Sequence, residues 1–258
     1  MSNEAINQGY VTFSIDDNGI ATIEFGHPLS NSLPGKVLSL LAETIENLGN
    51  NQKCSVIILS SGGEKAFCAG ASFDELISIQ NTEEGTAFFS GFAKVINACR
   101  KCPKFILGRV HGKAVGGGVG MAAACDYSFA TKYADVKLSE LAVGIGPFVV
   151  GPVIEHKIGT SAFSQLAINA TEWRSADWAK SKGLYADVFE EISEMDDEIY
   201  RLALQLSNSN PMAMKMMKSI FWKGTENWDT LLLERAQMSG ELVLSEFSKN
   251  AINKFKSK

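Results

Sequence analysis

Two glycine-containing segments, each placed between a buried strand and a helix, constrain this sequence more than any other feature. The first runs from Lys65 to Phe73 and reads KAFCAGASF, and the second runs from His111 to Met121 and reads HGKAVGGGVGM. Each follows a short apolar run, at 55–60 and at 105–110, that predicts a buried strand. Three successive glycines at a strand-to-helix turn leave N–H groups at the positive end of that helix. The second loop is therefore suited to a negatively charged oxygen, and the small residues of the first loop would let a ligand approach the backbone closely.

Common nucleotide and nucleophile motifs do not fit these loops. Neither glycine cluster matches GxGxxG in frame. Gly108 to Lys113 is one residue short of the P-loop spacing, and Ala114 stands where that motif needs Ser or Thr. No GxSxG nucleophile elbow is present in the sequence. For either loop alone, a tight turn without function stays open as an interpretation.

The order of apolar patterns predicts an α/β fold. Alternating stretches at 10–15 and 20–25 flank a turn cluster, which is typical of a hairpin. We expect a mixed core at 1–191 and a helical C-terminal region at 192–258, where strand patterns end. The other expected elements are helices at 33–48, 73–79, 84–99, 119–124, 149–156, 161–169 and 175–182, and strands at 127–130, 136–138 and 186–189.

Composition narrows the class of protein. The net charge of the 258 residues is −5, so no basic surface for nucleic acid is implied. The polar start does not resemble a signal peptide, and the longest apolar run is too short to span a bilayer, which predicts a cytoplasmic protein without membrane contact. Cys99 and Cys102 have the spacing of a redox or metal pair, but no second cysteine pair or nearby histidine completes a site, so we expect no metal site.

Taken together and in this order, the FCAGA and HGxAxGGG segments resemble the two signature loops of the crotonase (enoyl-CoA hydratase/isomerase) superfamily. The resemblance extends from the opening hairpin to about Glu190, and GGGVG with SELxVG is nearest in pattern to hydratases of the methylglutaconyl-CoA type. It implies a spiral of repeated ββα units, followed by C-terminal helices that pack between the subunits of a homotrimer or dimer of trimers.

The resemblance also assigns roles within the two loops. Members of the family hold the thioester oxygen with two backbone N–H groups, which correspond here to Ala71 and Gly117. Two preorganised donors at that oxygen would stabilise the negative charge of an enolate. Ala69, Ala71, Phe73 and Gly116 correspond to positions that contact the coenzyme A part of the substrate.

One carboxylate falls where the family places catalytic glutamates. The first glutamate position, three residues after Gly117, is Gly120 in this chain. The second is Glu140, in the stretch KLSELAVGIGP. We expect flanking by Leu138, Leu141 and Val143 to desolvate Glu140 and to raise its pKa, which suits acid–base catalysis. A surface carboxylate that caps a turn stays open as the alternative.

These residues predict a hydratase-type lyase that adds water to a 2-enoyl-CoA, with branched or carboxylated acyl groups as the substrate hypothesis. Because only one glutamate is present, two alternatives remain: a double-bond isomerase with Glu140 as its sole base, and a non-catalytic acyl-CoA-binding protein. In each case we expect no separate cofactor, because coenzyme A is part of the substrate. A role in fatty acid or amino acid catabolism follows from the same resemblance.

Overall fold

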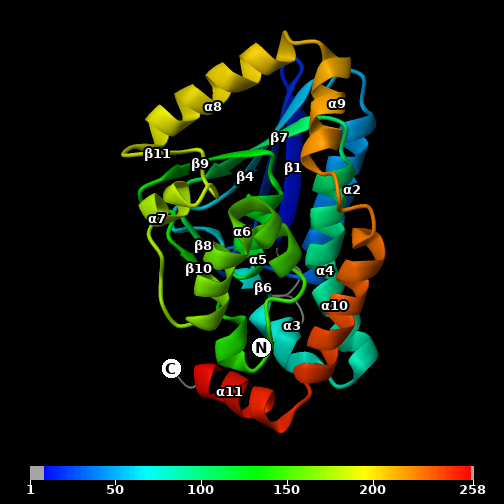
Figure 1. The fold of residues 1–258 in the computed structure, drawn as a ribbon, viewed down its shortest axis with the longest axis vertical. Helices are drawn as coiled ribbons and strands as arrows, with labels where there is room; N and C mark the ends of the chain where they lie inside the picture. Colours follow the sequence, from blue (N-terminus) through cyan, green and yellow to red (C-terminus); the bar gives the residue numbers. More distant parts are fainter. Residues whose placement is uncertain (1–8, 257–258) are drawn as a thin grey trace.

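The computed structural model describes residues 9–256 and is built around one six-stranded sheet (Figure 1). Its strands are β1 (Tyr10–Ile15), β2 (Ile20–Gly26), β4 (Val56–Ser61), β7 (Phe105–Val110), β9 (Tyr127–Thr131) and β11 (Asp187–Phe189). They lie side by side in the order β1-β2-β4-β7-β9-β11. The β1–β2 hairpin is antiparallel, and the other neighbouring pairs are parallel.

Helices form the crossover connections that parallel strands require. They are α2 (Gly35–Asn50), α3 (Phe73–Ser78), α4 (Thr82–Lys101), α5 (Gly117–Ala124), α6 (Gly151–Ile168), α7 (Ala176–Ser181), α8 (Ile192–Ser207), α9 (Pro211–Phe221), α10 (Trp228–Leu242) and α11 (Glu246–Lys256). No helix within residues 9–256 combines the length and the apolar composition of a membrane span.

The central sheet is covered on both faces, as the alternation along β4 demonstrates. Ile57 and Leu59 belong to the core that includes residues of α2 and α4, whereas Val56 and Ile58 pack in a second cluster with residues of α8. All six residues of β4 are buried. Burial on both faces explains why this strand is a continuous apolar run rather than an alternating one. Figure 1 shows α8 lying across the sheet on the side away from α2.

Five short strands form two smaller sheets and give the chain its repeating path. A three-stranded parallel sheet has the order β10-β8-β5, and a two-stranded one pairs β3 with β6. Four times, a strand of the large sheet is followed by a short strand and then by a helical turn or helix. This repetition is the expected spiral of ββα units. The short strands are β3 (Ser32–Leu33), β5 (Ala66–Cys68), β6 (Gly70–Ala71), β8 (Lys113–Val115) and β10 (Val136–Lys137), and a 3-10 helix, η1 (Glu140–Val143), follows β10.

The longer predicted elements are confirmed, and some have the same first and last residues as predicted. β7 has the predicted bounds of 105–110. The helices predicted at 149–156 and 161–169 are joined as α6, with a break at Gly159, where φ is +75° and ψ is 160°. Ser175 caps α7 by accepting a hydrogen bond from the Trp178 N–H.

Two local predictions are wrong at the short strands. Leu33 was expected to begin a helix, but it lies in β3, and Pro34 is an extended N-cap (ψ 155°) in front of α2. The two glycine segments were expected to be loops, but the first contains β5 and β6 and the second contains β8. The two or three residues of β3, β5, β6 and β8 show no pattern that separates a strand from a loop or a helix start, so pairing with a distant segment defines these strands.

A buried ion pair connects α9, one of the C-terminal helices, to the core. Lys218 of α9 contacts Asp126 at 2.7 Å, and both side chains are almost fully buried. Asp126 also accepts hydrogen bonds from the Ile106 N–H at 2.8 Å and from the Trp222 indole N–H at 3.1 Å. Every described element from Ile192 onward is a helix. The division of the chain into parts at residue 191 remains a prediction.

Candidate active site

The two glycine loops meet because the strands that precede them are neighbours. β5 and β8 pair in parallel, with Cys68 opposite Ala114. Since parallel strands end at the same edge of a sheet, the loops that follow also lie together. Gly70 has a φ of +94°, and a Cβ built on it would lie only 3.2 Å from the Val115 carbonyl oxygen and 3.8 Å from the Gly117 nitrogen. The absence of a side chain at Gly70 therefore lets the backbone beside Ala71 approach the start of α5.

The three glycines at the start of α5 lie where neighbouring atoms leave little room for side chains. Gly116 is the N-cap with a φ of +53°, and its N–H donates to the Lys137 carbonyl oxygen at 2.9 Å. A Cβ on Gly117 would overlap the Phe92 ring, and one on Gly118 would overlap the Cys68 carbonyl oxygen. N–H groups in the first turn of a helix have no intrahelical acceptor, so the Gly117 N–H is suited to an external oxygen.

Glu140 follows β10, the third strand of the same small sheet. β10 pairs with β8 in parallel, and η1 begins three residues after Lys137. The turn is closed by Gly144, which has a φ of +82° and whose N–H donates to the Leu141 carbonyl oxygen at 3.1 Å. Three adjacent strands therefore place the Ala71 loop, the Gly117 helix start and the Glu140 carboxylate at one edge.

The carboxylate of Glu140 is withdrawn from solvent. Its Oε2 is buried and has no hydrogen-bond partner among the described residues. Its Oε1 lies against Gly116, where a Cβ would come within 2.8 Å. Burial raises the pKa of the Glu140 carboxyl from 4.5 to about 7. The alternative of an ordinary surface carboxylate does not agree with this environment.

One expected cause of this shielding is corrected by the structure. The Leu141 side chain is 52% exposed and does not cover Glu140, because the first residue after Glu140 in η1 points outward. Leu138 is buried in the main core, and Val143 lines the same cavity as Glu140. Side chains distant in sequence, chiefly phenylalanines, form the rest of the surrounding wall.

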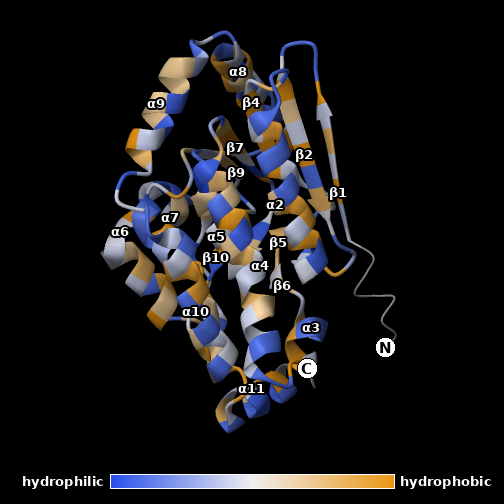
Figure 2. Cartoon of the chain, turned by 90° about the vertical axis from the view of Figure 1, so that its right-hand side faces the viewer, coloured by the Kyte–Doolittle hydropathy of each residue, from blue (hydrophilic) through white to orange (hydrophobic). Residues whose placement is uncertain are grey.

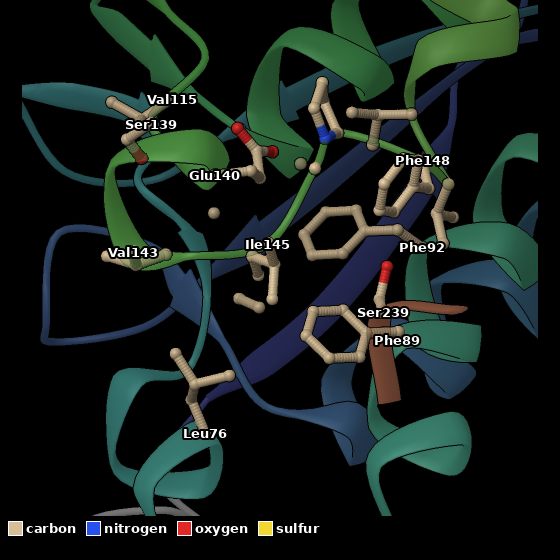
Figure 3. Close-up of a pocket in the computed structure, with 18 of the residues that line it drawn as sticks. Leu76, Phe89, Phe92, Val115, Ser139, Glu140, Val143, Ile145, Phe148 and Ser239 are labelled. Carbon is tan, nitrogen blue, oxygen red and sulfur yellow. The ribbon is translucent and has the colours of Figure 1, made fainter. Parts of the chain in front are cut away.

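A cavity of about 240 Å³ unites the predicted site residues (Figure 3). Sequence reasoning did not find its aromatic and C-terminal walls. Phenylalanines at helical spacing in α4 are typical of a core, and Ser239 in α10 carries no signal. The cavity is lined by all six predicted residues, Ala69, Ala71, Phe73, Gly116, Gly117 and Glu140, and also by Leu76, Phe88, Phe89, Phe92, Phe148, Val150 and Ser239.

The position expected for a first glutamate is closed off in this chain. A Cβ built on Gly120 would lie 2.6 Å from Cγ1 of Val150. Val150 precedes α6 and lines the cavity, so its side chain occupies the space that a residue at position 120 would need. Among the described residues that line the cavity, Glu140 carries the one carboxylate.

α11, the last described helix, contacts the segment that follows Glu140. Ser248 of α11 donates a hydrogen bond from Oγ to the Gly144 carbonyl oxygen at 3.0 Å. Ile145, in the same segment, packs in a small cluster with Val243 and Ile252. Within residues 9–256, no group of three histidine, cysteine or acidic side chains could hold a metal ion.

Comparison with known proteins gives a consistent assignment. The family described as Enoyl-CoA hydratase/isomerase matches residues 16–258. The short-chain-enoyl-CoA hydratase of Clostridium acetobutylicum is 29% identical over 239 residues, which are 92% of this chain and 90% of that protein. The mitochondrial methylglutaconyl-CoA hydratase of Mus musculus is 31% identical over 201 residues, 76% of this chain and 63% of that protein.

The fold is also found among solved structures. The crystal structure of an enoyl-CoA hydratase from Bacillus halodurans superposes with a TM-score of 0.87 at 21% identity, covering 95% of this chain and 99% of that chain. This likeness establishes the fold, and the family match extends over nearly the whole sequence. The chain therefore belongs to the enoyl-CoA hydratase/isomerase family and has the crotonase fold.

Proposed function

We propose that this protein binds an acyl-CoA thioester, stabilises its enolate, and moves protons with Glu140 as the single acid–base group. The observation that carries the proposal is one shielded carboxylate beside two backbone loops whose N–H groups can receive a negatively charged oxygen. Ala71 and Gly117 would donate to the thioester oxygen, where charge develops. Ala69, Ala71, Phe73 and Gly116 would contact the coenzyme A part, and no separate cofactor is needed.

The geometry favours double-bond isomerisation, which needs one base. Ionised Glu140 would remove a proton from C2 of a 3-enoyl-CoA, and the electron pair would move into the thioester to give a dienolate. Protonated Glu140 would then return the proton to C4, as the double bond moves to C2–C3. A pKa of about 7 lets one carboxyl group accept and donate a proton with similar ease near neutral pH.

Hydration is the second candidate, and the names of the similar proteins favour it. Here the oxygen of water would bond to C3 of a 2-enoyl-CoA while Glu140 takes the water proton. The same carboxyl would then deliver a proton to C2 of the enolate. This route asks Glu140 to serve both steps, since Val150 fills the space at position 120.

Exposed apolar side chains support the proposal of a homotrimer or dimer of trimers. α9 carries exposed methionines at positions 212, 216 and 217, and Ile220 and Phe221 are also exposed. Figure 2 shows this helix mostly in apolar colours. Exposed apolar side chains gathered on one helix are typical of a protein interface. Light scattering of the purified protein would measure the assembly.

Incubation with a panel of enoyl-CoAs in ¹⁸O-labelled water would test the function. We would supply linear and branched 2-enoyl-CoAs and 3-enoyl-CoAs, and analyse the thioesters by mass spectrometry. A shifted double bond without labelled oxygen would establish an isomerase, and one added labelled water would establish a hydratase. Acyl-CoA binding without turnover of any substrate would contradict the catalytic proposal and leave a binding protein.

A further inference from the structure

The part of the cavity beyond Glu140 is built from apolar side chains. Figure 3 shows Val115 and Ser139 on one side of Glu140, and Phe92, Phe148 and Ser239 on the other. The second side is walled by aromatic rings from α4 and by the segment that leads into α6, and Leu76 of α3 lies below Ile145 at another edge of the cavity.

The cavity offers an acyl group no positive charge. None of the described residues that line it is Lys, Arg or His. Among these described residues the one ionisable side chain is Glu140, which has the same sign as a carboxylate on a substrate. A buried carboxylate needs a cation or several hydrogen-bond donors to offset the loss of hydration.

The two hydroxyl groups of the cavity do not supply those donors. Ser239 Oγ donates its proton to the Arg235 carbonyl oxygen at 3.2 Å, within its own helix. Ser139 lies on the Val115 side of Glu140, away from the aromatic wall (Figure 3). A carboxylate on the acyl chain would therefore lie unpaired among phenylalanine rings, close to a second negative charge.

We infer that the substrate carries an uncharged, apolar acyl group and that carboxylated acyl-CoAs are excluded. This inference rests on the proposed function, because it takes the aromatic side of the cavity as the acyl pocket. The substrate hypothesis included branched and carboxylated acyl groups. The inference retains branched hydrocarbon chains as substrates and excludes carboxylated chains.

A matched pair of saturated thioesters tests the inference without any need for turnover. Pentanoyl-CoA and glutaryl-CoA differ in one end group, a methyl in the first and a carboxylate in the second. We expect calorimetry on the full chain at pH 8 to give glutaryl-CoA a dissociation constant at least about 30-fold higher. Equal or tighter binding of glutaryl-CoA would overturn the inference.

The same experiment separates this inference from the proposed function. If neither thioester binds, the acyl-CoA site itself is wrong, and the inference falls with it. If pentanoyl-CoA binds selectively but no enoyl-CoA is turned over, the catalytic proposal fails while the apolar pocket stands.

A cation placed at the edge of the cavity should change the preference. No residue of α3 is fully buried, so the helix should tolerate a longer side chain at Leu76. We expect Leu76→Arg to shift the ratio of the two dissociation constants about 10-fold toward glutaryl-CoA, and Leu76→Gln to leave the ratio unchanged. An unchanged ratio in a folded Leu76→Arg protein that still binds pentanoyl-CoA would mean that charge does not set the preference, and would overturn the inference.

Discussion

Val150 lies directly against Gly120, so that a Cβ on the glycine would come within 2.6 Å of Val150 Cγ1 and 2.8 Å of Val150 Cβ. The glycine and the valine therefore form a matched pair. Replacement of one without the other leaves either an overlap or a void.

We expect Gly120→Glu to lower the free energy of unfolding by about 1–3 kcal/mol, because Val150 must move or the carboxylate must be buried. Gly120→Glu combined with Val150→Ala should recover most of that loss, and this double variant is the better candidate for gained hydration activity. Urea denaturation of the wild type, both variants and the matched control Gly120→Gln would measure the effect. A single glutamate variant as stable as the wild type would disprove the coupling.

Glu140→Gln should remove the base while it keeps the shape of the cavity. We expect kcat/KM to fall by about 10²–10⁴-fold, and the affinity for pentanoyl-CoA to stay nearly constant. Steady-state kinetics and calorimetry would measure the two effects separately. Glu43→Gln, on the exposed face of α2, is the control and should behave like the wild type. Normal turnover in Glu140→Gln would exclude Glu140 from the mechanism.

The pH dependence of the reaction should report Glu140 directly. Because the carboxylate must be ionised to take a proton and its pKa is raised to about 7, kcat/KM should fall tenfold per pH unit below pH 7. An acidic limb near pH 4.5, the ordinary value for glutamate, would mean that burial does not control this group. The measurement is a pH–rate profile at subsaturating substrate.

The free energy of unfolding should also depend on the ionisation of Glu140. It should fall as pH rises, whereas kcat/KM should rise. The folded chain binds the Glu140 proton more tightly than the unfolded chain, so the stability contribution of protonated Glu140 is lost as pH rises from 4.5 to about 7. Glu140→Gln should therefore be more stable than the wild type by about 3 kcal/mol above pH 8, and equal to it below pH 4. Urea denaturation at the two pH values would compare them, and an equal difference at both would contradict this linkage.

Ser248 is expected to act on catalysis through position alone. Ser248→Ala removes the hydrogen bond to the Gly144 carbonyl oxygen, which should lower stability by about 1 kcal/mol. We expect kcat to fall several-fold with little change in KM, and the acidic limb of the pH profile to move toward lower pH as Glu140 gains solvent. Ser219→Ala, at an exposed serine of α9, is the control. Equal changes in the two serine variants would remove the positioning role.

The fold was predictable where residues form long periodic runs. SVIILS and FILGRV indicate strands because β-branched and apolar residues that are buried on both faces leave little room for another interpretation. The short strands β5, β6 and β8 were not predictable as strands, since two or three residues show no clear alternation and their pairing joins distant segments.

The site was predictable in its backbone part and less so in its walls. Gly70 and Gly117 stand out because only glycine permits the close approach that joins the two loops. The shielding of Glu140 was expected, but Leu141, its neighbour in sequence, does not provide it. Phe92 and Ser239 reach the cavity from helices whose patterns indicate only packing, so nothing local marks them.

The hydrogen bond between Ser248 and Gly144 joins residues that are 104 positions apart, and it has a consequence for biosynthesis. While the chain is being made, the segment with Glu140 leaves the ribosome long before the helix that steadies it. The nascent protein can form its central sheet and both glycine loops early, yet the acyl cavity lacks part of its wall until residue 239 and those after it have emerged. We therefore expect the cavity around Glu140 to be completed late in synthesis, after the residues of the central sheet have emerged.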